Sequence, residues 1–266
     1  MLKDKVALVT GGARGIGAAI ALALSAQGAR VALLDLDGAE AEKTAAGLPM
    51  PAMALACDAA DERQVIGAVR AVVEWLGALD ILVNNAGLGR PVGASGRVDD
   101  MSAAEWDAQL AQDLRSTFIV TKTAIPHLKA RGGGAIVNIA SITGLVGSAT
   151  QPAQAAAKAG MISLTKSLAL DYAPHDIRVN AICPGYIWTR PWERLTADLR
   201  RTTPEFAALS PRAIFEEVMK RRVPLGREQT VEDIGHLAAF LASDAARNIT
   251  GQWIAVDGGI TLRQAQ

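Results

Sequence analysis

Three residues in the second half of the chain, Ser141, Gln154 and Lys158, combine side chains that can bind and polarise an oxygen atom. A serine hydroxyl donates and accepts hydrogen bonds, a glutamine amide orients a neighbouring group, and a lysine ammonium supplies positive charge. Gln154 and Lys158 are four residues apart, so a helix would present both on one face. A glutamine amide has no usable proton, so a site made of these three side chains would lack an obvious general acid.

A glycine-rich segment near the amino terminus, residues 10–17 (TGGARGIG), has the composition of a phosphate-binding turn. It follows a predicted strand and opens a predicted helix, whose N–H groups and positive dipole end favour a pyrophosphate. Gly11, Gly15 and Gly17 would let the backbone turn tightly and approach the ligand closely. The segment predicts a dinucleotide site, although ordinary strand–helix turns also use glycine.

Asp35 ends the second predicted strand, where a carboxylate can accept both hydrogen bonds from an adenosine ribose. Its charge would repel a 2′-phosphate, which favours NAD over NADP. Arg14 in the glycine turn argues the other way, because a guanidinium there could pair with that phosphate. Asp35 could instead cap a helix, but Asp37 is better placed for that role.

The elements that must position these residues follow a regular alternation. Helices are predicted near residues 15–27, 39–47, 61–76, 103–130, 154–173 and 230–243, and strands at 6–10, 31–35, 53–58, 81–84, 135–140, 178–183 and 253–257. Alternating strands and helices imply crossover connections and a parallel sheet covered on both faces. We therefore predict an α/β fold, a Rossmann-type doubly wound parallel sheet of about seven strands in three layers, forming one domain over residues 1–266.

Two segments interrupt the alternation. Residues 87–98 (GLGRPVGASGRV) are rich in glycine and are predicted to form a flexible loop. Residues 186–227 contain prolines that separate short amphipathic pieces, and they follow a strand end, where open α/β sheets bind ligands. We interpret 186–227 as a substrate-covering lid, with a packing appendage as the alternative.

The composition excludes several classes of protein. Lys and Arg together number 27 and so do Asp and Glu, so no overall basic charge favours nucleic acid or an anionic membrane. Cys57 and Cys183 are too few and too far apart for a disulfide framework or a metal site, and we expect buried structural thiols. No membrane-spanning apolar run and no signal peptide are visible, which predicts a soluble cytoplasmic protein.

Over nearly its whole length the chain resembles the short-chain dehydrogenase/reductase family. The matching positions are the glycine turn at 10–17, Asp58, the Asn-Asn-Ala-Gly motif at 84–87, the segment 178–185 (RVNAICPG), Thr189 and the segment 256–259 (VDGG). The resemblance implies a NAD-dependent enzyme whose cofactor-binding residues are Gly11, Arg14, Gly15, Ile16, Gly17, Asp35, Asp58, Asn85, Ala86, Gly87, Lys158, Pro184, Gly185 and Thr189.

The chemical site departs from that family at two positions. By resemblance, Ser141 binds the substrate oxygen, and Lys158 binds the nicotinamide ribose. The family's proton-donating tyrosine is replaced by Gln154, and its asparagine on an earlier helix is replaced by Asp113. We therefore expect a catalytic site of Ser141, Gln154, Lys158 and Asp113 with an atypical route for the proton.

Three groups are candidates to replace the missing proton donor. Lys158 could transfer a proton if desolvation favoured its neutral form. Asp113 could pair with Lys158 or drive a water relay, although that pairing would keep the lysine charged. Tyr186 follows Pro184 and Gly185 and could offer a phenol from another direction, or it could simply line the pocket.

Three functions are compatible with this pattern. The leading hypothesis is a NAD(H)-dependent oxidoreductase for a small hydroxyl or carbonyl compound. A lyase or isomerase on the same scaffold could use Ser141, Asp113 and Lys158, because a fold does not fix a reaction. A non-catalytic nucleotide-binding protein is the third. The resemblance also implies a homo-oligomer, either a dimer or a tetramer.

Overall fold

One seven-stranded sheet forms the centre of the structure, a computed structural model that describes residues 1–87, 96–148 and 150–262. All neighbouring strands are parallel, and their order is β3-β2-β1-β4-β5-β6-β7. The predicted doubly wound sheet is confirmed. Its strands are β1 (Val6–Thr10), β2 (Arg30–Asp35), β3 (Ala52–Ala56), β4 (Ile81–Asn84), β5 (Gly134–Ile139), β6 (Ile177–Pro184) and β7 (Trp253–Val256).

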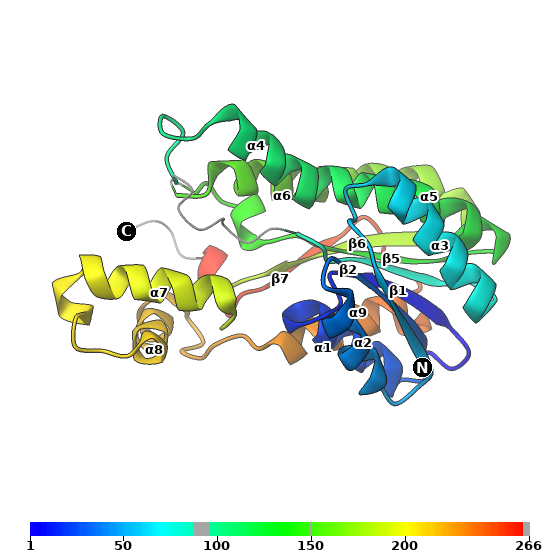
Figure 1. Cartoon of the computed structure of the whole chain (residues 1–266), viewed down its shortest axis with the longest axis horizontal. Coiled ribbons are helices and arrows are strands. Elements are labelled where there is room, and N and C mark those ends of the chain that lie inside the picture. Colours follow the sequence, from blue (N-terminus) through cyan, green and yellow to red (C-terminus); the bar gives the residue numbers. More distant parts are fainter. Residues whose placement is uncertain (88–95, 149, 263–266) are drawn as a thin grey trace.

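Helices cover both faces of the sheet and complete three layers (Figure 1). One face carries α1 (Gly15–Ala26), α2 (Gly38–Ala46) and α9 (Val231–Ala242), and the other carries α3 (Glu62–Leu76), α5 (Ser116–Ala130) and α6 (Pro152–Tyr172). Each face buries its own apolar core, which is why β1 is buried at every residue. Burial on both faces explains why the strands read as continuous apolar runs.

Side chains cap the helices that start near the predicted site. Asp37 precedes α2, and its Oδ1 accepts a hydrogen bond of 3.2 Å from the backbone N–H of Glu40. An N-cap of this kind stabilises a helix by about 1 kcal/mol. The expectation that Asp37, and not Asp35, caps this helix is confirmed.

The segment predicted as one helix near 103–130 is divided by a wider turn. α4 (Ala103–Leu110) leads into a π turn at Ala111–Arg115, and α5 continues from Ser116. Hydrophobic periodicity does not reveal a π turn, because it changes the helical repeat by only one residue. Turns of this type are rare inside α-helices and often occur at functional sites.

Residues 186–227, predicted to be irregular, contain two well-formed helices. α7 (Arg190–Thr202) and α8 (Pro211–Arg222) pack together beyond the carboxyl end of β6 and project from the sheet (Figure 1). Pro211 starts α8, where a missing N–H does no harm, so a proline there begins a helix instead of breaking one. Aromatic rings join the two helices, with Trp192 and Phe215 centroids 4.9 Å apart.

Residues 88–95 of the predicted glycine-rich loop lie outside the described residues. Across the described part of the chain, no helix is both long and apolar enough to span a membrane.

Candidate active site

The loops after β1 and β4 meet where the strand order reverses, the usual ligand position in an open α/β sheet. Thr10 at the end of β1 joins them, because its Oγ1 accepts hydrogen bonds of 3.0 Å from the backbone N–H groups of Asn85 and Ala86. In return, the Asn85 side-chain amide donates to the backbone oxygens of Thr10 and Gly11. Sequence reasoning omitted Thr10 from the cofactor-binding residues, although it heads the glycine motif.

The glycine turn has the geometry that a pyrophosphate requires. Gly11 adopts a φ of +63°, which residues with a Cβ rarely adopt. A Cβ at Gly17 would collide with the backbone oxygen of Gly11, so the start of α1 lies directly against the turn. No side chain caps the amino terminus of α1 within the described residues. Its first N–H groups can therefore bind an anion, and these residues fit a dinucleotide.

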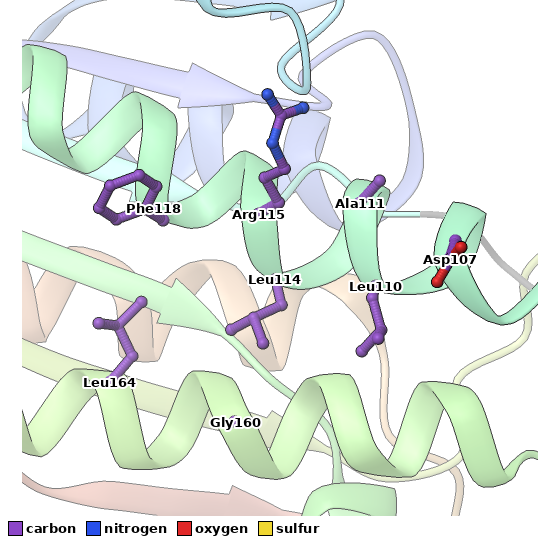
Figure 2. A pocket seen from close by; sticks show the side chains of 8 residues that line it. All are labelled: Asp107, Leu110, Ala111, Leu114, Arg115, Phe118, Gly160 and Leu164. Atoms are coloured by element: carbon purple, nitrogen blue, oxygen red, sulfur yellow. The ribbon is translucent and has the colours of Figure 1, made fainter.

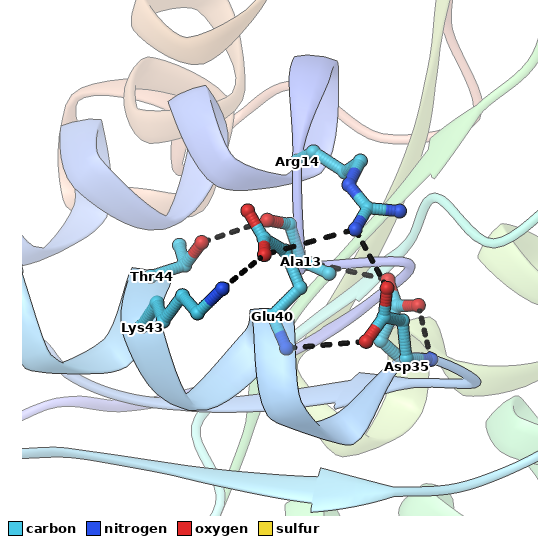
Figure 3. Close-up of polar contacts among 7 residues, drawn as sticks. Ala13, Arg14, Asp35, Glu40, Lys43 and Thr44 are labelled. Carbon is cyan, nitrogen blue, oxygen red and sulfur yellow. Dashed lines mark hydrogen bonds and ion pairs between the residues drawn. The ribbon is translucent and has the colours of Figure 1, made fainter.

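Asp35 faces the glycine turn (Figure 3). Its Oδ2 accepts a hydrogen bond of 2.9 Å from Ala13, and its Oδ1 accepts one of 3.0 Å from Asp37, both from backbone N–H groups. An ionised carboxylate offers about four acceptor positions, so Asp35 can still accept from a ribose. It therefore fixes the turn and remains suited to a sugar hydroxyl.

Arg14 directs its guanidinium towards two acidic side chains (Figure 3). Its Nη2 donates to Asp37 Oδ2 at 2.6 Å and lies 3.8 Å from Glu40 Oε2. The hydrogen bond between them raises the pKa of Arg14 and lowers the pKa of Asp37. Because Arg14 already has acidic partners, it is a weaker indication of a 2′-phosphate site than the sequence suggests.

Lys158 and Asp113 meet in the interior. The Lys158 Nζ donates to the backbone oxygen of Ile139 at 3.1 Å and lies 3.9 Å from Asp113 Oδ1. Asp113 lies in the π turn, and its other carboxylate oxygen accepts a hydrogen bond from the side-chain amide of Gln109. The pairing of Asp113 with Lys158 that the sequence suggested is present.

Ser141 and Gln154 come from two different elements. Ser141 follows β5, and its Oγ accepts a 3.1 Å hydrogen bond from the Thr143 backbone, so its hydroxyl hydrogen can still serve a substrate oxygen. Gln154 is half-buried on α6, one turn before Lys158, as predicted. A Cβ at Gly144, just after Ser141, would lie 2.7 Å from the Lys158 backbone, so these elements pack closely.

Cys183 is buried beside the same residues. Burial raises the pKa of its thiol to about 11, while a hydrogen bond from the Ser141 backbone N–H and the charge of Lys158 act in the opposite direction. Cys57 is also buried and free. The prediction of two buried thiols is confirmed.

The remaining predicted cofactor residues lie at the same edge of the sheet. Asp58, after β3, accepts hydrogen bonds from the Ala60 backbone at 2.9 Å and from the Gln112 side chain at 3.4 Å. The Gly185 N–H, after β6, donates to Val256, and Thr189 precedes α7. Ile16, in the first turn of α1, packs against the core.

Gln109, which bonds to Asp113, is not among the residues that the sequence predicts for the site. It lies four residues before Asp113, a spacing at which two helical side chains can interact. This four-residue spacing between a glutamine and an acid is the feature of the sequence that could have indicated the contact.

Comparisons with known proteins identify the family. A family model described as enoyl-(acyl carrier protein) reductase matches residues 11–261. The chain is also 39% identical to 2-(S)-hydroxypropyl-CoM dehydrogenase 3 of Xanthobacter autotrophicus, over 98% of each chain. The chain belongs to the short-chain dehydrogenase/reductase family.

Other members of the short-chain dehydrogenase/reductase family agree in both sequence and fold. Trans-4-hydroxycyclohexanecarboxylate dehydrogenase of Sinomonas cyclohexanicum is 40% identical, covering 97% of this chain and 93% of that protein. A solved structure of NAD⁺-bound xylitol dehydrogenase superposes with a TM-score of 0.88 at 34% identity, covering 97% of this chain and 99% of that one. The protein is therefore an oxidoreductase of the short-chain type for small hydroxyl or carbonyl compounds.

Proposed function

We propose that this short-chain dehydrogenase/reductase uses NAD(H) and transfers the substrate proton without a phenol. The position of Asp35 is the main observation that favours NAD over NADP as the cofactor. Its carboxylate faces the glycine turn, while Arg14 is bound to Asp37. A 2′-phosphate placed there would meet a carboxylate, and the nearby guanidinium is already paired. The NAD⁺-bound xylitol dehydrogenase to which the fold is similar supports the same cofactor.

The cofactor supplies the hydride, and the protein binds the cofactor and orients the substrate against it. Ser141 polarises the substrate oxygen through its hydroxyl, and Gln154 orients that oxygen through its amide. Lys158 binds the nicotinamide ribose, and Asp113 lies 3.9 Å from its ammonium. The loops after β1, β3, β4 and β6 contribute the remaining cofactor contacts that were predicted from the sequence.

We also propose that α7 and α8, within residues 186–227, form a lid over the substrate. They follow β6, and Trp192 of α7 and Phe215 of α8 form an aromatic cluster with Tyr186 and Trp188 of the segment that precedes α7. Tyr186 packs both against this cluster and against the core beside Cys183. That position is suited to the wall of a pocket between the lid and the sheet.

A homo-oligomer, dimer or tetramer, is part of the proposal. An apolar groove of about 540 Å³ lies between the segment of α4 and α5 and helix α6 (Figure 2), and Phe118 in its lining is exposed. Leu110, Leu114, Phe118 and Leu164 line it. An exposed apolar groove of this kind is typical of a surface that binds another protein, and a second copy of the chain would bury it.

A panel of secondary alcohols and ketones, including cyclic ones, tests the proposed reaction. We expect NAD⁺ reduction or NADH oxidation, followed at the NADH absorbance band, with a subset of the panel. Product formation without net change in that band would indicate a lyase or isomerase. NADH binding without turnover of any compound would indicate a non-catalytic nucleotide-binding protein.

A further inference from the structure

A buried polar chain runs along the inner side of α4 and the π turn. The Gln109 side-chain amide donates to Oδ2 of Asp113, and Oδ1 of the same carboxylate lies 3.9 Å from Lys158 Nζ. Gln109, Asp113 and Lys158 are 6%, 0% and 7% exposed, so little solvent reaches the carboxylate and the ammonium. Buried charges depend on such partners, because each has lost its hydration.

The backbone after β4 fixes the Asp113 carboxylate from the opposite side. A Cβ at Gly87 would collide with Asp113 Oδ1 and would lie 3.5 Å from Lys158 Nζ. The carboxylate therefore packs directly against a glycine, in space that a larger residue would fill. Gln109 holds one carboxylate oxygen, so the other is directed towards the lysine.

Lys158 Nζ has two oxygen atoms close to it. The Ile139 backbone oxygen accepts its hydrogen bond at 3.1 Å, and the Asp113 carboxylate provides an opposite charge. The charge of Lys158 also acts on Cys183, where it lowers the pKa of the thiol, but burial has the larger effect and raises that pKa. These two contacts hold the Lys158 side chain in one direction, which suits a group that binds a hydroxyl.

We propose that Gln109 is a positioning residue that acts through Asp113 to aim the Lys158 ammonium at the nicotinamide ribose. This role rests on the proposed function, in which Lys158 binds that ribose. A glutamine suits the position, because a neutral donor orients the carboxylate without altering the charge of a buried ion pair.

The test compares NADH with ADP, which lacks the nicotinamide ribose. Gln109→Met keeps the length of the side chain and removes its donor. We expect calorimetry to show NADH binding about tenfold weaker, as for loss of one hydrogen bond to a charged group, and ADP binding unchanged. Gln112→Met is the matched control, because Gln112 bonds to Asp58. By the family resemblance Asp58 contacts the adenine, which NADH and ADP both carry, so any effect should be equal for both ligands.

A double-mutant cycle separates positioning from folding. In an Asp113→Ala background, Gln109→Met should have no further effect on NADH binding, because its partner is gone. Unchanged ADP binding reports that each variant is folded. Additive effects, or an equal loss of NADH and ADP binding in Gln109→Met, would overturn the positioning role alone. Failure of the unmodified protein to bind NADH would overturn the proposed function as well.

Discussion

Lys158 in this site has a fixed anion as its partner and no phenol one turn before it. Asp113 lies 3.9 Å from the ammonium, and Gln154 occupies the helix position that could otherwise carry a titratable hydroxyl. A buried cation can stabilise a phenolate only when its charge is not already compensated. We therefore propose that Gln154 and Asp113 act together as a matched pair.

This pairing predicts non-additive effects on turnover. Gln154→Tyr alone should gain little with simple ketones, because Asp113 compensates the lysine charge that would lower the pKa of an introduced phenol. Gln154→Tyr combined with Asp113→Asn should gain on the order of 10²-fold, within the range of general acid catalysis. Initial rates of NADH oxidation by these two variants and by the unmodified protein measure this.

Gln154→Phe with Asp113→Asn is the control, since it adds the ring without the hydroxyl. A gain with this control, or a full gain with Gln154→Tyr alone, would show that the two positions are not coupled through a proton donor.

The buried thiols predict a dependence on alkaline pH. Burial raises the pKa of Cys57 and Cys183 from 9.0 to about 11. Between these values the unfolded thiols ionise while the folded ones keep their protons, so the free energy of unfolding should fall as the pH rises. Urea unfolding across this range, compared with a Cys57→Ala/Cys183→Ala variant, measures the effect. An identical pH dependence in both proteins would contradict it.

At the scale of elements, the sequence predicts the strands and helices that follow a repeating apolar pattern, and it does not predict single local features. The seven strands and most helix positions follow from apolar periodicity, because burial on two faces imposes it. The π turn at Ala111–Arg115 and the Gln109–Asp113 contact have no such signature. The sequence analysis also predicts only short pieces where the structure has helices at 190–202 and 211–222. Prolines that lie in the first turn of these helices were interpreted as breaks.

The contact between the glycine turn and α1 predicts opposite effects at two helical glycines. Gly17→Ala should destabilise the fold by about 1–3 kcal/mol and weaken NADH binding, because the methyl group would meet the Gly11 oxygen. Gly67→Ala in α3 meets nothing within 4 Å and should stabilise by about 1 kcal/mol. Urea unfolding of both variants checks this; a stabilised Gly17→Ala would exclude the close contact.

At the scale of the whole molecule, the groove beside α5 predicts an oligomer that one charge can disrupt. Phe118 lines it and is 52% exposed. Phe118→Glu should lower the molar mass measured by light scattering, because a buried carboxylate would lack a partner. Leu22→Glu, on α1 at the opposite face, is the matched control and should leave the mass unchanged. An unchanged mass for Phe118→Glu would exclude this groove as the interface.

The functions proposed for the glycine turn and for the buried polar chain both require that the protein binds NAD(H). Calorimetric titration of the purified protein with NADH and, in parallel, with NADPH tests this most directly. We predict micromolar binding of NADH, and NADPH binding at least about tenfold weaker because of Asp35. Equal or tighter binding of NADPH would contradict the assignment of Asp35, and binding of neither would contradict the proposed oxidoreductase.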